Sequence, residues 1–463
     1  MDTDTIAAIS TAVTNAGIGI VRISGEDSFQ IIDKIYRSEN GKKILSQEKS
    51  HTVHYGYICD GEKKIDEVMV LILKSPNTYT KEDTVEIDCH GGILVMRRIL
   101  ETVIKYGARL AEPGEFTKRA FLNGRIDLSQ AESVMDLINA KNDFALKSSI
   151  DQLGGSLKKA IKEMREKILH EIALIESALD DPEHISMEGY GEQLLEILQE
   201  LSHRIESLLS VSENGQLLKE GINTAIIGKP NAGKSSLMNV LAGKERAIVT
   251  DIAGTTRDMI EEQVNLNGVT LNIMDTAGIR DTQDVVEKIG VDKAKKYLSE
   301  SDLVFYVIDS STIFDENDKE ILELLDQKKS ILLLNKSDLD PVTSEEKVRQ
   351  ILQEREMLHP LISISAKEKS GLEELKAVIQ NMFFKGEIQI QDEIYITNVR
   401  QKSSLESAKE SLSMVERSIA DGMPEDFYSI DLMNAYQELG NITGETVGED
   451  LVNEIFSKFC MGK

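Results

Sequence analysis

The feature that most constrains the fold is a glycine-rich turn, residues 228–236, between an apolar run at 224–227 and a helix-like segment at 237–241. In a strand, turn and helix of this kind, backbone N–H groups and the helix N-terminus converge on an anion, and only glycine lets the backbone wrap so closely. Lys234 adds a positive charge, and the Ser235 hydroxyl can ligate Mg²⁺. In isolation the pattern also fits an ordinary glycine-rich turn, so its meaning depends on the motifs that follow.

Three further motifs follow predicted strands. An aspartate after the strand at 270–274 can hold Mg²⁺ through water, and the glycine of the same motif can offer its N–H to a γ-phosphate. A carboxylate after the strand at 330–334 can accept two N–H donors of guanine that adenine lacks, and a mismatched base leaves buried polar groups unpaired. A motif after the strand at 361–364 fits a backbone contact to the guanine carbonyl. Together they predict GTP binding by Asp275, Thr276, Ala277 and Gly278, by Asn335, Lys336, Ser337 and Asp338, and by Ser365, Ala366 and Lys367.

In many GTPases a glutamine directly after the glycine that corresponds to Gly278 orients the attacking water. Here the position is Ile279, which has no hydrogen-bonding group. The glycine-rich turn, at Asn231, and the loop at 250–258, which is expected to act as a switch, both offer oxygens close to the phosphates. A monovalent cation bound there can supply the positive charge that an arginine finger supplies in other GTPases. We expect nucleotide contacts from Asn231, Ala232, Gly233, Lys234, Ser235 and Ser236, and from Thr250, Asp251, Ile252, Ala253, Gly254, Thr255 and Thr256.

Charge and cysteine content limit the class of protein. The net charge is -27 without a basic tail, which argues against non-specific coating of nucleic acid because that attraction needs many Lys and Arg contacts to phosphate. There are three cysteines, Cys59, Cys89 and Cys460, and neither a signal peptide nor an apolar run long enough to span a bilayer. We therefore expect a cytoplasmic protein that does not bind membranes, with Cys59 and Cys89 as small buried apolar residues.

The pattern predicts a multidomain α/β and α protein. Residues 1–118 form an α+β domain with strands at 18–23, 53–58, 67–73 and 84–88. Residues 119–216 are helical, and Ser129 with Glu132 predicts a capping box. Residues 217–382 alternate strands and helices, as in an inserted Ras-like P-loop G domain with a doubly wound, mostly parallel sheet. Residues 383–463 return to helix and complete a split helical bundle domain.

At this point the chain resembles the tRNA uridine-modification GTPase MnmE (TrmE) family over essentially its whole length. Only the G motifs are shared with other GTPases, whereas the remaining matches are specific to the family. These are Ser75-Pro76-Asn77 with Glu82-Asp83, Cys89-His90-Gly91-Gly92, the run from Pro113 to Arg125, the run from Asp251 to Asp258, and the terminal Cys460-Met461-Gly462-Lys463. The family's loop before the strand that bears Arg22 is rich in Pro and Gly, and here residues 10–17 contain no proline.

The resemblance implies potassium-dependent GTP hydrolysis through G-domain dimerisation. K⁺ ligands would fall on Asn231, Thr250, Ile252 and Thr255, Mg²⁺ ligands on Ser235 and Thr256, and Glu287 would help to orient the catalytic water in place of the glutamine. With Lys234 and Asn231, Glu287 completes the expected catalytic set. A pocket for 5,10-methylene-tetrahydrofolate would comprise Arg22, Glu82, Arg125 and Lys463, and Cys460 matches the tail cysteine of the family.

The family also implies partners. A homodimer through the N-terminal domain would act with an FAD-dependent partner protein, as a heterotetramer, to install an aminomethyl-type (carboxymethylaminomethyl) group on the wobble uridine of certain tRNAs. Two other functions remain open at this stage. One is a potassium-dependent ribosome-assembly GTPase, which predicts a basic RNA-binding domain after the G domain, where this chain is acidic. The other is a GTP-gated scaffold without one-carbon chemistry.

Overall fold

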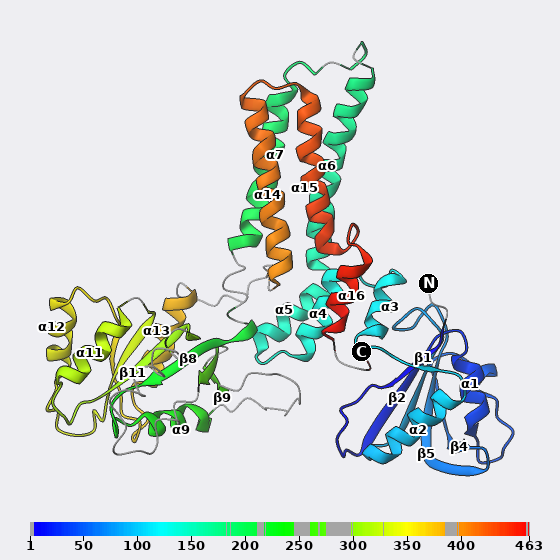
Figure 1. Cartoon of the computed structure of the whole chain (residues 1–463), viewed down its shortest axis with the longest axis horizontal. Coiled ribbons are helices and arrows are strands. Elements are labelled where there is room, and N and C mark those ends of the chain that lie inside the picture. The colour runs from blue at the N-terminus through cyan, green and yellow to red at the C-terminus, as the bar shows by residue number, and fades with distance from the viewer. Residues whose placement is uncertain are drawn as a thin grey trace. The chain divides into compact units, whose positions relative to one another are not determined.

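The computed structural model describes residues 4–463 except for 182, 186, 211–216, 218, 245–259, 267–268, 275–297, 299, 327, 385–395, 397, 460–461 and 463. By its internal contacts the chain divides into two compact units (Figure 1). Unit 1 comprises Met1–Met135, Gln152–Gln199 and Ser407–Lys463, and unit 2 comprises Asp136–Asp151 and Glu200–Glu406. The domain boundaries expected from the sequence stay a prediction.

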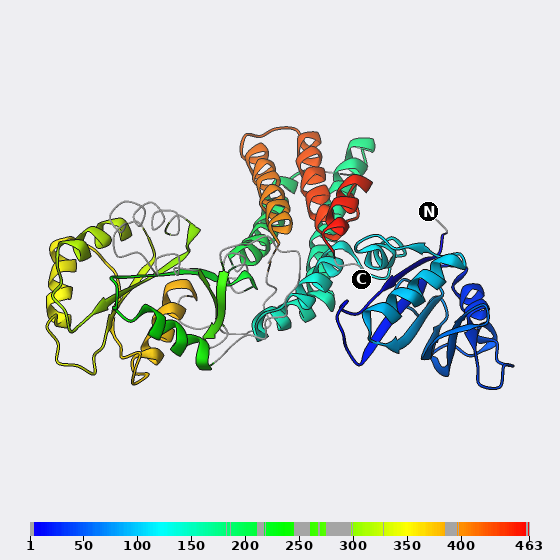
Figure 2. The same cartoon turned by 60° about the horizontal axis from the view of Figure 1, so that its bottom comes forward.

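Unit 1 begins with a seven-stranded sheet in the order β3-β4-β5-β6-β2-β1-β7. Helices α1 (Ser28–Ile35) and α2 (Ile93–Lys105) share one apolar core with inward residues of the sheet such as Val70 and Ile87, so both cover the same face (Figures 1 and 2). The four strands expected from the sequence, at 18–23, 53–58, 67–73 and 84–88, are confirmed as β2, β4, β5 and β6. The strands are β1 (Ile6–Ile9), β2 (Ile18–Ser24), β3 (Tyr36–Arg37), β4 (Thr52–Asp60), β5 (Lys63–Leu73), β6 (Thr84–His90) and β7 (Arg109–Leu110).

The opposite face of this sheet is covered in part by α3 (Glu115–Leu122). Phe116 of α3 packs with Ile6, Ala8 and Ala111 in a small apolar cluster. Beside this cluster, Arg22 of β2 and Glu86 of β6 are cross-strand neighbours, and their side chains form an ion pair of 2.7 Å. Polar groups of the face therefore lie next to α3, away from the core under α1 and α2.

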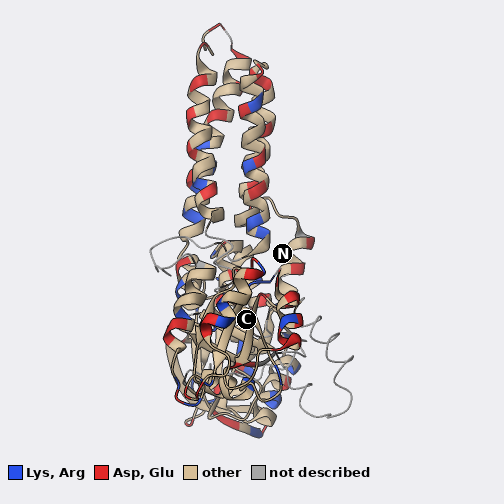
Figure 3. Ribbon diagram, turned by 90° about the vertical axis from the view of Figure 1, so that its left-hand side faces the viewer, with Lys and Arg blue, Asp and Glu red and all other residues tan. Residues whose placement is uncertain are grey.

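Long helices follow in unit 1. The helical segment predicted at 119–216 includes α6 (Ser156–Asp180), which packs along α15 (Glu425–Thr443). Arg165 of α6 stacks on Tyr436 of α15 and pairs with Glu445. Lys and Arg are interspersed with Asp and Glu along the long helices in the view of Figure 3. Helix α16 (Glu449–Ser457) also belongs to unit 1, whereas the division between the units falls within α4 (Leu128–Ile138), α7 (Tyr190–Ser210) and α14 (Val399–Ala420).

The capping box predicted at Ser129 and Glu132 is wrong, because α4 already begins at Leu128. The cap is Asp127, whose carboxylate accepts a 2.9 Å hydrogen bond from the Gln130 N–H, while the Gln130 side chain accepts one of 3.0 Å from the Asp127 N–H. The Ser129 hydroxyl donates to Asp127 from inside the helix. Within the described residues, no helix is both long and apolar enough to cross a bilayer.

Unit 2 contains a six-stranded sheet in the order β13-β12-β11-β8-β10-β9, parallel throughout except for the antiparallel pair β9 and β10. Successive residues of β11 face opposite sides: Phe305 packs in the core with α9 and α13, and Tyr306 packs in the core with α11 and α12. The doubly wound, mostly parallel sheet predicted from the sequence is confirmed. Its elements are β8 (Ile222–Ile227), α9 (Lys234–Lys244), β9 (Ile260–Leu266), β10 (Val269–Met274), β11 (Leu303–Asp309), α11 (Glu316–Leu325), β12 (Ser330–Asn335), α12 (Glu345–Glu354), β13 (Leu361–Ser363) and α13 (Leu372–Phe384).

The core of unit 2 also includes a segment that precedes the strands of the sheet in sequence. Phe144, in α5 (Asp143–Leu153), is 3% exposed and belongs to the same apolar cluster as Ile222 and Leu271. Next to it, the Asn142 amide donates a buried hydrogen bond of 2.9 Å to the Thr270 hydroxyl of β10. One aromatic side chain and one amide therefore fix the start of α5 to the sheet.

Replacing Phe144 with Ala should lower the free energy of unfolding of unit 2 by about 3–5 kcal/mol, because a buried aromatic ring leaves a cavity. The measurement is hydrogen exchange of peptides from β8, β11 and β12 in the full chain. Leu146→Ala, on the same helix but 42% exposed, is the matched control and should change this free energy by less than about 0.5 kcal/mol. Equal exchange in the two variants would contradict this role of Phe144.

Candidate functional site

The phosphate loop connects β8 to α9. At two of its glycines, any side chain would force neighbouring atoms to move. Gly228 has φ +151°, and a Cβ atom there would lie 2.3 Å from the carbonyl oxygen of Val307. Gly233 has φ +100°, and its Cβ would lie 2.1 Å from Nδ2 of Asn335. The loop is thus pressed against the neighbouring strand ends, and the close approach requires glycine.

Two polar residues of this loop have distinct settings. Asn231 is exposed and has φ +62°, a left-handed conformation that Asn adopts more easily than most residues. The Lys234 ammonium donates to the carbonyl oxygens of Gly228 and Lys229, both at 2.8 Å, so it lies within the loop. Burial lowers the pKa of Lys234, because the charged form is partly removed from water. An anion held by the loop would offset that cost.

The predicted base-binding residues meet the phosphate loop through Asn335, the last residue of β12. Its amide nitrogen donates to the carbonyl oxygen of Ala232 at 2.8 Å, and its amide oxygen accepts from the N–H of Ala366 at 3.1 Å. The Ser365 hydroxyl donates to the Asp338 carboxylate at 2.6 Å, and this bond is the main cause that holds the pKa of Asp338 below its usual value. The arrangement presents an ionised carboxylate that can accept N–H donors of a base.

Lys336 belongs to the same motif as Asn335 and Asp338. It has φ +65°, and its ammonium pairs with the Asp309 carboxylate at the end of β11 at 2.5 Å. Burial raises the pKa of Asp309, but hydrogen bonds from Lys336 and Ser311 outweigh it and leave the pKa lowered. Strand ends of β8, β11, β12 and β13 thus meet at one edge of the sheet, where ligands of open parallel sheets bind.

The structure brings together one part of the expected nucleotide site, namely Asn231, Ala232, Gly233, Lys234, Ser235, Ser236, Asn335, Lys336, Ser337, Asp338, Ser365, Ala366 and Lys367. The remaining residues, at 250–256 and 275–278, and Glu287 lie outside the described residues. In the described part of the chain, no group of three or more His, Cys, Asp or Glu side chains is arranged to hold a metal. Of the predicted Mg²⁺ and K⁺ ligands, only Ser235 and Asn231 are described.

A second group of candidate residues lies on the sheet of unit 1, around Tyr79. The Arg22 guanidinium lies 5.7 Å from the centre of the Tyr79 ring and 5.5 Å from that of Phe116, and the Arg125 guanidinium lies 4.7 Å from the Tyr79 ring. Arg125 is exposed. The sequence analysis names both arginines and includes Phe116 in the run 113–125, but it gives no signal for Tyr79. The result is a cationic and aromatic surface that suits a flat, anionic ligand.

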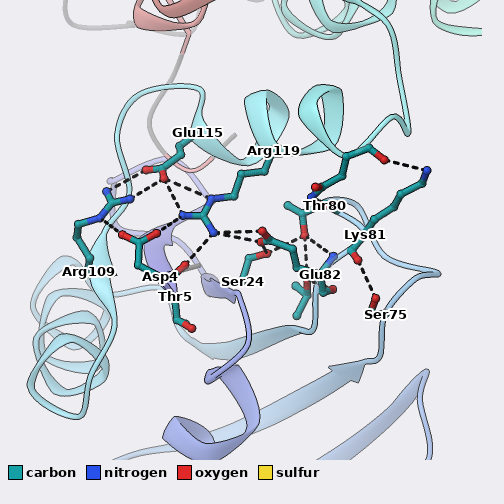
Figure 4. Close-up of polar contacts among 12 residues, drawn as sticks. Asp4, Thr5, Ser24, Ser75, Thr80, Lys81, Glu82, Arg109, Glu115 and Arg119 are labelled. Atoms are coloured by element: carbon teal, nitrogen blue, oxygen red, sulfur yellow. Dashed lines mark hydrogen bonds and ion pairs between the residues drawn. The ribbon is translucent and has the colours of Figure 1, made fainter. Parts of the chain in front are cut away.

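Glu82 lies beside this surface in a dense polar network (Figure 4). Its carboxylate accepts hydrogen bonds from the Ser24 hydroxyl at 2.7 Å and from the Arg119 guanidinium at 3.2 and 3.4 Å. Arg119 falls within the run of residues 113–125 that was matched to the family, and that run was the available signal for it. Ser24 gave no such signal.

The C-terminal tail approaches the same sheet. Gly462 has φ +83°, and a Cβ there would lie 2.2 Å from the carbonyl oxygen of Ile9 at the end of β1. Upstream, Phe459 and Phe456 of the tail region pack against Gly114 at the start of α3. Cys460 and Lys463 themselves lie outside the described residues.

The two described cysteines are buried free thiols, as expected. Burial raises the pKa of the Cys89 thiol to about 11, and its hydrogen donates to the carbonyl oxygen of Gly19. A thiol with so high a pKa is a poor nucleophile at neutral pH. Cys89 is therefore a core residue of the sheet.

A mostly parallel sheet with a phosphate loop after β8 and an Asn-Lys-x-Asp motif at the end of β12 defines a P-loop domain of the GTP-binding class. Two family models match the chain: the GTP-binding protein TrmE N-terminus at residues 5–125 and the MnmE helical domain at residues 128–460. The chain belongs to the MnmE family of tRNA modification GTPases. The family and fold class expected from the sequence are thereby confirmed.

Curated relatives share this length. The protein named tRNA modification GTPase MnmE of Lachnoclostridium phytofermentans is 57% identical over 463 residues, which is 100% of both chains. The protein of the same name from Thermoanaerobacter pseudethanolicus is 50% identical and covers 99% of each chain. Among solved structures, an Era protein of Aquifex aeolicus bound to GDP·AlF4⁻ is 28% identical over 42% of this chain and 67% of its own, with a TM-score of 0.28.

Replacing Asp338 with Asn should weaken GTP binding by about 1–3 kcal/mol, roughly 5- to 150-fold, because an N–H donor of guanine loses its acceptor. ATP binding should not change, and the discrimination between the two nucleotides should therefore fall. Equilibrium binding of fluorescent GTP and ATP analogues measures both affinities. Asp340→Asn, an exposed carboxylate two residues further on, is the control that should leave the affinities unchanged.

The ion cluster near Glu82 predicts a dependence of stability on pH. Burial raises the pKa of Glu115, but hydrogen bonds from Arg109, the Glu112 N–H and Arg119 outweigh it, so the folded pKa lies below 4.5. Its contribution to stability is therefore present above that value and is lost as the pH falls through the folded pKa. Thermal unfolding against pH should show a smaller loss in acid for Glu115→Gln than for the wild type. Glu112→Gln, an exposed neighbour, should follow the wild type.

Proposed function

We propose that the chain is a potassium-dependent GTPase that acts, with an FAD-dependent partner protein, in the carboxymethylaminomethyl-type modification of the wobble uridine of certain tRNAs. The observation that carries the proposal is the joining of the phosphate loop to the base motifs through Asn335, in a chain that matches its relatives over their full length. GTP hydrolysis would drive dimerisation of the G domains and a conformational change in a cytoplasmic complex.

In hydrolysis, the phosphate loop would hold the nucleotide through its N–H groups and Lys234, and Asp338 would select guanine. Mg²⁺, held by Ser235 and Thr256, would neutralise charge on the phosphates. Asn231, with Thr250, Ile252 and Thr255, would hold K⁺, which supplies positive charge as an arginine finger does. The exposed, left-handed Asn231 fits this role because its side chain is not committed to a partner within the described loop. Glu287 would orient the water that attacks the γ-phosphorus as the bond to the leaving oxygen breaks.

In unit 1, the surface around Tyr79 fits 5,10-methylene-tetrahydrofolate, which has an aromatic ring system with N–H donors and a carboxylate tail. Arg22 and Arg125 would contact the carboxylate tail and the flat ring system of the ligand. Glu82 would accept hydrogen bonds from the N–H groups of the ring system. The tail is held at β1 by Gly462, which supports a contribution from Lys463 and a positioning role for Cys460. We place the functional domains at 1–118, 119–216, 217–382 and 383–463, with dimerisation through the first.

Exchange of K⁺ for Na⁺ should lower the rate of GTP turnover by about 10-fold or more, because one stabilising charge at the phosphates is lost. Asn231→Ala should reduce the dependence on K⁺, whereas GTP affinity should change little. Turnover is measured by phosphate release at constant ionic strength. Equal rates in both salts would exclude the cation mechanism.

Nucleoside analysis of tRNA from a strain that lacks the gene separates the proposed function from its alternatives. Loss of the wobble-uridine modification is expected, and its restoration by the wild-type gene is the control. An intact modification together with a defect in ribosomal particles would instead favour a ribosome-assembly GTPase. Wild-type tRNA and wild-type ribosomes would favour a GTP-gated scaffold.

A further inference from the structure

We propose that Arg119, together with Ser24, is a positioning residue for Glu82 in the tetrahydrofolate site. This inference rests on the proposed function of unit 1 and deepens it. In this role the two side chains do not touch the ligand. They fix the carboxylate that would receive its N–H donors, so that it does not have to be ordered during binding.

The Glu82 carboxylate is held at both oxygens. Oε2 accepts from the Ser24 hydroxyl at 2.7 Å, and Oε1 accepts from Nη1 of Arg119 at 3.2 Å. The backbone of Glu82 is held as well, because its carbonyl oxygen accepts from the Thr78 hydroxyl at 2.7 Å and its N–H donates to the Thr80 hydroxyl at 3.2 Å. An ionised carboxylate has about four acceptor sites. Since the Glu82 side chain is 23% exposed, acceptor capacity remains toward solvent.

Arg119 can act as a rigid support because it is itself fixed. Its side chain is 9% exposed, and its Nη2 donates to Asp4 at 2.7 Å and to Glu115, one turn earlier on α3, at 3.0 Å. Its Nη1 also donates to the carbonyl oxygen of Asp4 at 2.8 Å. Figure 4 shows the guanidinium between the Asp4 and Glu115 carboxylates on one side and Glu82 on the other. A buried arginine with so many partners has little rotamer freedom left.

Charge in this network favours a ligand that donates hydrogen bonds. Three carboxylates (Asp4, Glu82 and Glu115) share two guanidiniums (Arg109 and Arg119), which leaves one formal negative charge. Arg109 pairs with Asp4 and Glu115 but has no hydrogen bond to Glu82. Glu82 therefore depends on Arg119, which it shares with two other carboxylates, and its remaining charge is available to N–H donors.

The difference between the two arginines provides a matched pair of variants. Arg119→Lys and Arg109→Lys both keep the charge and both disturb contacts with Asp4 and Glu115, but only the first removes the fork that reaches Glu82. Both should lower the melting temperature of unit 1. Only Arg119→Lys should weaken binding of tetrahydrofolate, by about 10-fold or more, since small displacements of a binding group have large effects. Arg109→Lys should stay within about 2-fold of the wild type.

The experiment is isothermal titration calorimetry of tetrahydrofolate into the full-length chain, with thermal unfolding of the same samples. Glu82→Gln should weaken binding strongly, and the double variant Glu82→Gln with Arg119→Lys should bind no more weakly than Glu82→Gln alone, because coupled residues are not additive. Ser24→Ala, which changes no charge, should also weaken binding, and it tests the proposal if Arg119→Lys does not fold.

Two kinds of failure are distinguishable. If the wild type does not bind tetrahydrofolate, or if Glu82→Gln binds it normally, the proposed folate site is wrong. If Glu82→Gln weakens binding but Arg119→Lys and Ser24→Ala do not, or if Arg109→Lys weakens it as much as Arg119→Lys, the site stands and the positioning role is overturned.

Discussion

The side-chain amide of Asn335 is the interaction on which the nucleotide site depends. Its amide nitrogen bonds to the phosphate loop at Ala232 and its amide oxygen to the loop at Ala366, so one planar group sets the distance between these two loops. The same amide lies where a side chain at Gly233 would have to go. The loops predicted to select the base and to bind the phosphates therefore belong to a single hydrogen-bonded unit, built on a fully buried parallel strand.

The region around Glu82 relies on a different kind of interaction. There the groups are held by ion pairs between elements that are distant in sequence, from Asp4 before β1 to Arg119 in α3. When one partner is removed from a half-buried network of this kind, the other charge is left without compensation. The loss of folding free energy is then larger than the stabilisation that the intact pair provides. Such a network is well suited to keep side chains in one geometry, and less suited to tolerate change.

The meeting of the phosphate loop with the Asn335 and Ser365 motifs could be predicted from the sequence, because each motif is local in sequence and the topology of a parallel sheet brings the strand ends together. The group around Tyr79 could be expected only in part, because the family resemblance names Arg22 and Arg125 but not the ring between them. Arg22, Tyr79 and Arg125 meet only through tertiary packing, and no spacing in the sequence links them. Strand β1 was missed because four apolar residues, with Ile6, Ala7 and Ala8 buried, show no alternation. The cap of α4 was misplaced because Ser129 resembles a cap while Asp127 is the residue that acts as one.

The place of Phe144 in the core of unit 2 has a consequence for how the G domain is isolated for study. A fragment cut at the sequence boundaries, residues 217–382, would lack an aromatic side chain that fills the apolar cluster beneath β8 and β10. Nucleotide measurements on such a fragment would concern a sheet with a vacant space next to the strand that leads to Asp275. During synthesis, Phe144 is made well before the phosphate loop. Its side chain therefore stays uncovered until the strands of the sheet have been made and folded.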